Sequence, residues 1–139
     1  MSLVLIVEDN IDNYELVHFL LGRAGYETRW AHSGGEGILM ANEEKPELIL
    51  MDLSLPEMDG WTATKSLKSD PETKHIPIVA LTAHTLPSDR KRALQAGCDS
   101  YLSKPINIAL FTETVANLIA KADMRSRRRS KTKSRDNQA

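Results

Sequence analysis

Five polar residues of the chain have types that suit metal and phosphoryl chemistry, and each follows a short apolar run. Glu8 and Asp9 come directly after the first run, Asp52 follows another, and Thr82 and Lys104 follow two later ones. If these runs are parallel strands of one sheet, their carboxyl ends meet at the edge where open α/β sheets carry their functional sites. The sequence therefore predicts that three carboxylates, a hydroxyl and an ammonium converge there.

Three carboxylates packed together repel one another and raise each other's proton affinity unless a cation lies among them. Oxygen ligands alone suit a hard divalent ion such as Mg²⁺, with Mn²⁺ as a substitute. With such an ion balancing the carboxylates, Lys104 and the Thr82 hydroxyl remain as donors. Such donors suit the oxygens of a transferring phosphoryl group.

Hydrophobic periodicity indicates the elements that must position these residues. Short apolar runs predict strands buried on both faces, and apolar residues at helical spacing predict helices between them. The predicted strands are Leu3–Val7, Thr28–Ala31, Leu48–Met51, Ile76–Leu81 and Ser100–Leu102, and the predicted helices are Ile11–Ala24, a segment opening at Ser33, Trp61–Leu67, Pro87–Ala96 and Ile108–Ala122. Five strands and five helices in strict alternation predict an α/β domain with a parallel sheet covered on both faces.

Two of these helices carry cap signals. Gly25 follows the first helical pattern, where a left-handed residue commonly ends a helix. Ser33 and Glu36 have the spacing of a capping box, although two glycines in the same turn weaken it. These signals predict where the first helix ends and where the second begins.

Length and composition limit the class of protein. The 139 residues, 41% of them hydrophobic, fit one globular domain. The single cysteine, Cys98, cannot form an internal disulfide, which excludes a disulfide-built secreted scaffold. No apolar run approaches the roughly 18 residues of a membrane helix, and Glu8 and Asp9 follow the apolar opening segment too soon for a secretory signal. We therefore expect a cytoplasmic protein.

The charges divide the chain in two. Residues 1–123 hold 11 Lys and Arg against 18 Asp and Glu, whereas residues 124–139 hold 7 Lys and Arg and one acid, Asp136. The second segment has almost nothing apolar to bury, so we expect a folded domain over 1–123 and a disordered basic tail over 124–139. Nucleic acid could bind only through this tail. A tail that contacts the acidic body, or one that is simply solvated, is the alternative.

Four segments carry a resemblance to a known family. They are LIVEDN (Leu5–Asn10), LILMDLSLPEMDG (Leu48–Gly60), IVALTAH (Ile78–His84) and YLSKP (Tyr101–Pro105). In this joint spacing, over residues 3 to about 121, the sequence resembles a two-component response-regulator receiver domain of the single-domain, chemotaxis-regulator type. The resemblance implies a flavodoxin-like fold whose five parallel strands lie in the order 2-1-3-4-5.

The resemblance also implies roles for the predicted site. Asp52 would be the phosphoacceptor, taking a phosphoryl group from a histidine kinase or a histidine phosphotransfer protein. Asp9 would be the principal acidic Mg²⁺ ligand, with Glu8 acting directly or through water. Asp52 itself and the backbone carbonyl of Ser54 would be further ligands. The chain would then belong to a phosphorelay or two-component system.

Further implied roles concern the phosphorylated state. Lys104 would pair with a phosphoryl oxygen, and the peptide bond between it and Pro105 is usually cis in this family. Thr82 would be the switch hydroxyl that moves toward that oxygen, and Tyr101 the switch aromatic that moves inward with it. His84 lies where the family varies its residue to tune the phosphoryl lifetime.

The implied output is a change of binding surface rather than turnover of a substrate. A receiver catalyses only its own phosphorylation and dephosphorylation, and it is an enzyme in that narrow sense alone. Its usual surface for a downstream protein is formed by the fourth helix, fifth strand and fifth helix, here about residues 87–122. The same pattern would fit a receiver fragment of a longer regulator.

Two other classes of protein share parts of this pattern. A phosphatase of the aspartyl-nucleophile type also uses a strand-end Asp, Mg²⁺ and Lys, but it needs a second Asp where this chain has Ser54. A flavodoxin would need phosphate-binding Ser and Thr after the first strand, where Glu8 and Asp9 would repel FMN. The sequence therefore favours the receiver.

Overall fold

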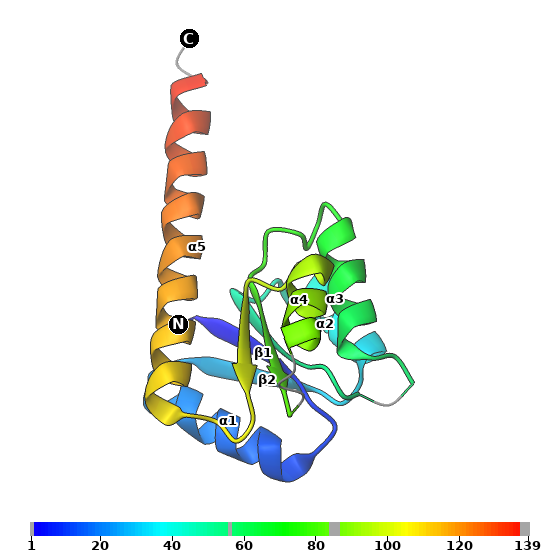
Figure 1. Cartoon of the computed structure of the whole chain (residues 1–139). Coiled ribbons are helices and arrows are strands. Elements are labelled where there is room, and N and C mark those ends of the chain that lie inside the picture. The colour runs from blue at the N-terminus through cyan, green and yellow to red at the C-terminus, as the bar shows by residue number, and fades with distance from the viewer. Residues whose placement is uncertain (1, 56, 84–86, 137–139) are drawn as a thin grey trace.

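The computed structural model describes residues 2–55, 57–83 and 87–136, with side chains through Met124, and contains five strands alternating with five helices (Figure 1). The strands are β1 (Leu3–Val7), β2 (Glu27–Ala31), β3 (Leu48–Asp52), β4 (Ile78–Thr82) and β5 (Ser100–Ser103), and the helices are α1 (Ile11–Arg23), α2 (Gly34–Glu44), α3 (Gly60–Ser69), α4 (Pro87–Ala96) and α5 (Ile108–Asp136). Every neighbouring pair of strands is parallel, in the order β2-β1-β3-β4-β5. The predicted fold class and strand order are confirmed.

Side-chain alternation along the strands divides the core into two layers. Leu5 and Val7 of β1 face a cluster that includes side chains of α2, α3 and α4, whereas Val4 and Ile6 face a cluster that includes side chains of α1 and α5. Figure 1 shows the same three-layer arrangement, with α1 and α5 on one side of the sheet. Both faces are covered, which explains why the central strands are apolar at successive positions.

The strand order places the functional edge of the sheet. The chain passes from β1 outward to β2 and returns to β3 on the other side of β1, so the carboxyl ends of β1 and β3 lie side by side at the point where the winding reverses. The pairings Val7 with Met51 and Asp52 with Leu81 set the register of the central strands. The residues that follow Val7 and Met51 therefore face the same crevice.

The cap signals are observed with one difference. Gly25 adopts a positive φ of 91° just after α1, as predicted. At the start of α2 the Ser33 hydroxyl accepts a hydrogen bond from the Glu36 N–H at 3.2 Å. The Glu36 carboxylate accepts a hydrogen bond from the N–H of His32, at 3.3 Å, rather than from that of Ser33. The box is therefore displaced by one residue on its carboxylate side.

The C-terminal segment differs from the expectation of disorder. Helix α5 continues to Asp136, and Figure 1 shows it extending well beyond the sheet. Lys, Arg, Ala and Met are strong helix formers, and a helix already nucleated by packing extends without a new nucleation cost. A segment without an apolar stripe in its sequence is therefore helical here, and the domain boundary at residue 123 stays a prediction. Among the described residues, no helix has both the length and the apolar character needed to cross a membrane.

We predict that Gly60→Ala lowers the free energy of unfolding by about 1–3 kcal/mol, the usual cost of overpacking. A Cβ at Gly60 would meet the backbone oxygen of Asp52 and would lie 2.6 Å from the Cα of Leu53. Gly22→Ala, where a Cβ meets nothing within 4 Å, is the control and should be neutral or slightly stabilising. Urea unfolding of both variants measures the difference, and equal stabilities would contradict this packing.

Candidate functional site

Asp52 is the last residue of β3 and its side chain is buried, with 3% of the residue exposed. Its Oδ1 accepts a hydrogen bond from the Ser54 N–H at 2.9 Å. Its Oδ2 lies 3.4 Å from the Lys104 Nζ. Each carboxylate oxygen therefore has one donor, and the side chain is fixed at the carboxyl edge of the sheet.

Glu8, one residue beyond β1, is equally buried at 3% exposure. Its Oε1 accepts from the N–H of Asn10 at 3.1 Å, and its Oε2 accepts from the Lys104 ammonium at 3.3 Å. Its backbone carbonyl accepts from the indole Nε1 of Trp30 at 2.7 Å. Trp30 in turn stacks on Tyr14 of α1, with ring centroids 4.1 Å apart. Both the side chain and the backbone of Glu8 are thus held by neighbouring elements.

Lys104 joins the two acids. It follows β5, its peptide bond to Pro105 is cis, and its backbone N–H donates to the Thr82 carbonyl at 2.7 Å. The ammonium contacts Glu8 and Asp52 together. One cation therefore serves two buried carboxylates.

The pKa of Glu8 is raised from 4.5 to about 7. The largest cause is burial, which penalises the charged form, followed by a hydrogen bond to Asp52 and the negative charge of Asp52. Lys104 and the Asn10 N–H lower the pKa but do not cancel these effects. Because a single ammonium does not balance both acids, the site favours the protonated form of Glu8 in the absence of another cation.

Asp9 completes an acidic cluster on the solvent side. One carboxylate oxygen from each of Glu8, Asp9 and Asp52 lies within 4.8 Å of the others, and only Asp9 is exposed. An oxygen-only donor set with excess negative charge fits a hard divalent cation. Ser54 lies beside Asp52, but the bond recorded for it uses its N–H. The role of its carbonyl as a ligand stays a prediction.

Thr82 and Tyr101, the two expected switch residues, are in contact. Thr82 ends β4 and is completely buried, while Tyr101 of β5 is partly buried against the core. The pKa of Tyr101 is raised, first by burial and then by the negative charge of Asp89, although a hydrogen bond with the Thr82 side chain opposes the shift. His84 lies outside the described residues. The structure therefore links the switch pair directly.

The doubly wound sheet and the acid–lysine constellation at its carboxyl edge together define a receiver domain. A family model described as the response regulator receiver domain matches residues 4–116. The polar-differentiation response regulator DivK of Brucella ovis is 45% identical over 119 residues, which are 86% of this chain and 97% of that protein. The chain belongs to the response regulator receiver domain family.

Solved structures agree with this assignment. A response regulator from Chloroflexus aurantiacus has a TM-score of 0.82 and 34% identity, covering 86% of this chain and 98% of its own. The receiver domain of a sensor histidine kinase from Pseudomonas aeruginosa has a TM-score of 0.80, 34% identity and the same coverage, and that structure holds a magnesium ion coordinated in its active-site cleft.

Membership of the family establishes general properties. Receiver domains are signalling modules rather than conventional enzymes, are phosphorylated on an aspartate and depend on Mg²⁺, which they bind in an acidic pocket. They interact with histidine kinases or phosphotransfer proteins. Which residues of this chain carry out these steps is a separate question.

The structure brings together every predicted acid and Lys104, and it adds Trp30, which has no motif in the sequence. The only sequence signal for Trp30 is its place in the predicted strand Thr28–Ala31. Its bond to the Glu8 carbonyl becomes visible only once β2 pairs with β1, where Trp30 lies opposite Ile6. Trp30 is therefore a supporting residue that sequence reasoning missed.

We predict that the metal-free protein loses stability as the pH rises from about 4.5 to about 7. Glu8 has its ordinary pKa of 4.5 in the unfolded chain and about 7 in the folded one, so the folded state holds more protons in this window. Glu8→Gln should flatten the dependence, whereas Glu15→Gln on the exposed side of α1 should keep it. Urea unfolding in a chelator across this range measures the slope, and a slope unchanged in Glu8→Gln would contradict the assignment.

Proposed function

We propose that Asp52 accepts a phosphoryl group from a histidine kinase or histidine phosphotransfer protein in a Mg²⁺-dependent reaction. The observation that carries the proposal is the Lys104 ammonium shared by two buried carboxylates, of which Asp52 is the one at the end of the central strand β3. An Asp fixed by the Ser54 N–H and paired with the Lys104 ammonium is positioned as a nucleophile. Glu8 also accepts a backbone N–H, from Asn10, but its raised pKa makes it the poorer nucleophile.

The residues present fit a divalent cation. Asp9, Asp52, the Ser54 carbonyl and Glu8, directly or through water, would hold Mg²⁺, with Mn²⁺ as a substitute. When bound, such an ion neutralises part of the charge on the carboxylates and on an approaching phosphate. An oxygen of Asp52 attacks phosphorus as the bond to the donor breaks. Lys104 then pairs with a phosphoryl oxygen in place of a carboxylate.

The same residues would also support dephosphorylation, in which the phosphoryl group is transferred from Asp52 to water. We propose that the chain catalyses only this phosphorylation and dephosphorylation of itself. Lys104, whose ammonium contacts Asp52, and Thr82, at the end of the adjacent strand β4, would orient the phosphoryl oxygens. A charge-assisted contact from an ammonium is the stronger of the two.

The hydrogen bond between Thr82 and Tyr101 provides the route for signalling. When the Thr82 hydroxyl turns toward a phosphoryl oxygen, it leaves Tyr101, whose ring then moves inward. Because the phosphoryl group makes contacts in only one arrangement, it shifts the population toward that arrangement. Residues 87–122, which hold α4, β5 and the packed part of α5, would present the change to a downstream protein.

A cytoplasmic location and the partners of the basic segment remain predictions. The helical course of α5 through residue 136 keeps seven Lys and Arg on a projecting element, which suits a polyanion such as nucleic acid. A solvated segment without a partner fits the same observation. No geometry of the site depends on either.

We predict that Mg²⁺ and acetyl phosphate add one phosphoryl group to the protein, located on Asp52 by mass spectrometry. Asp52→Asn should abolish labelling, and a chelator should suppress it in the wild type. Asp59→Asn, at the N-cap of α3, is a matched control that should label normally. Full labelling of Asp52→Asn would contradict the proposal.

We predict that Thr82→Ala still accepts the phosphoryl group but loses much of the response over residues 87–122. The phosphoryl group would then lack the hydroxyl that connects it to Tyr101. Labelling by mass spectrometry and backbone chemical shifts with and without acetyl phosphate separate the two effects. Ser103→Ala, exposed at the end of β5, should respond as the wild type does, and the same response in Thr82→Ala would show that the coupling is absent.

A further inference from the structure

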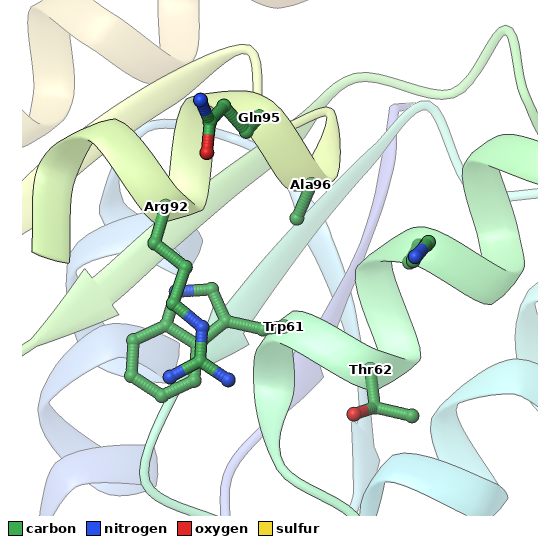
Figure 2. Close-up of a pocket in the computed structure, with 6 residues that line it drawn as sticks. Trp61, Thr62, Arg92, Gln95 and Ala96 are labelled. Atoms are coloured by element: carbon green, nitrogen blue, oxygen red, sulfur yellow. The ribbon is translucent and has the colours of Figure 1, made fainter.

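A pocket of about 300 Å³ lies between α3 and α4, away from the acidic cluster. Figure 2 shows side chains from the two helices facing one another across it. Its lining residues are Trp61, Thr62, Lys65, Arg92, Gln95 and Ala96. None of them is acidic, and two are cations.

Arg92 lies across the ring of Trp61, with its guanidinium carbon 4.1 Å from the ring centroid (Figure 2). Trp61 also packs against the core cluster beneath α3. The stack fixes the plane of the guanidinium while leaving the donors at its edge available. Because the ring lies between the core and Arg92, it offers no open face on which a nucleobase could stack.

The charge around the pocket opposes that of the domain. Residues 1–123 carry an excess of seven acids, yet α3 and α4 contain five cations and one acid. These are Lys65 and Lys68 on α3, and Arg90, Lys91, Arg92 and Asp89 on α4. Lys68 is paired with Asp99 at 2.9 Å. Within the described side chains, neither Lys65 nor Arg92 has a carboxylate within ion-pair distance.

A buried donor lies in the same wall. The indole Nε1 of Trp61 is covered and, among the described residues, has no hydrogen-bond partner. Unsatisfied buried donors are uncommon and costly. Trp61 lines the pocket, so its wall contains a donor that has no partner among the described residues.

We propose that this pocket binds an acidic segment of a partner protein, with carboxylates received by Arg92 and Lys65. Arg92 offers two parallel donors to one carboxylate, and Lys65, one helical turn beyond Trp61, is placed to pair with a second. A pocket of this volume holds a few side chains rather than a single small ion. The acidic surroundings would repel a long polyanion such as nucleic acid, whereas a short segment meets only the local cations.

The pocket also spans two elements adjoining the phosphorylation site. Helix α3 begins at Gly60, against the backbone of Asp52, and α4 begins five residues after Thr82. Any difference in peptide affinity between the phosphorylated and unphosphorylated protein would be matched by an equal effect of the peptide on the phosphorylation equilibrium. This coupling rests on the proposed function, whereas binding to the unphosphorylated protein does not.

The test titrates the full ¹⁵N-labelled chain with an N-acetylated, C-amidated tetraglutamate peptide. Binding is followed by the NMR signals of the tryptophan indole N–H groups. Trp61 should shift saturably, whereas Trp30, at the other site, serves as the internal control. Peptide bound to the basic residues beyond 124 would leave the Trp61 signal in place. Tetraglutamine should not move it, and inorganic phosphate at equal ionic strength should bind far more weakly.

Variants at exposed positions assign the cations. Arg92→Gln and Lys65→Gln should each weaken binding about three- to fivefold, the upper part of the range for an exposed charge pair, and Arg92→Lys should fall between wild type and Arg92→Gln. Lys121→Gln on α5 should stay within twofold. Asp52→Asn should bind tetraglutamate as well as wild type does. Peptide binding at the pocket and phosphorylation of Asp52 can therefore fail independently of one another. Equal shifts with tetraglutamine, equal affinity for phosphate, or unchanged affinity in Arg92→Gln would each overturn the proposal.

Discussion

The Lys104 ammonium lies between two buried carboxylates, 3.3 Å from Glu8 and 3.4 Å from Asp52, and it balances only one negative charge. The remaining charge must be met by a proton, which raises the pKa of Glu8, or by a cation held with Asp9. This deficit gives the site its affinity for positive charge. It exists only because β1, β3 and β5 end at the same edge, and the rest of the fold serves to keep those three ends together.

The opposite edge of the sheet shows how that alignment is fixed. Near the amino ends of β4 and β5, Asp99 accepts the Ile78 N–H at 2.8 Å and the Lys68 ammonium at 2.9 Å. The same ammonium donates to the Ile76 carbonyl at 2.8 Å. Helix α3 is thereby tied to both strands at one end, while Gly60 allows its other end to lie against Asp52. The charge of Asp99 is paired with Lys68 at the amino ends of the strands. At the carboxyl ends, the charge of Lys104 does not balance both Glu8 and Asp52.

Much of the fold could be predicted because its signals are local. Continuous apolar runs identified β1, β3 and β4, since strands buried on both faces need apolar residues throughout. Asp52 and Thr82, the last residues of β3 and β4, fell outside the predicted strands. A polar side chain ends the apolar pattern one residue before the backbone pairing of the strand ends. The length of α5 was missed for the reverse reason: the sequence of its last turns has no apolar stripe, so periodicity had nothing to detect.

The site was predictable in its members but not in its electrostatics. Residue types and strand ends brought Glu8, Asp9, Asp52 and Lys104 together, and the resemblance assigned their roles. The raised pKa of Glu8 depends on its burial and on its contact with Asp52, and neither can be read from the sequence. Trp61 and Arg92 lie 31 positions apart on different helices, so their stack likewise appears only when α3 and α4 are placed side by side.

The bond from the Trp30 indole to the Glu8 carbonyl gives the molecule an optical property. The indole N–H of Trp30 donates to the backbone of a charged site, and its ring stacks on Tyr14 and makes a tilted contact with His32. The emission of such an indole depends on the local electric field. Changes of charge at the carboxyl edge therefore alter the colour and yield of Trp30 fluorescence. Trp61, on the α3 side of the sheet, senses a different environment. Trp30 and Trp61 therefore report on two different parts of the domain through their fluorescence, without any added label.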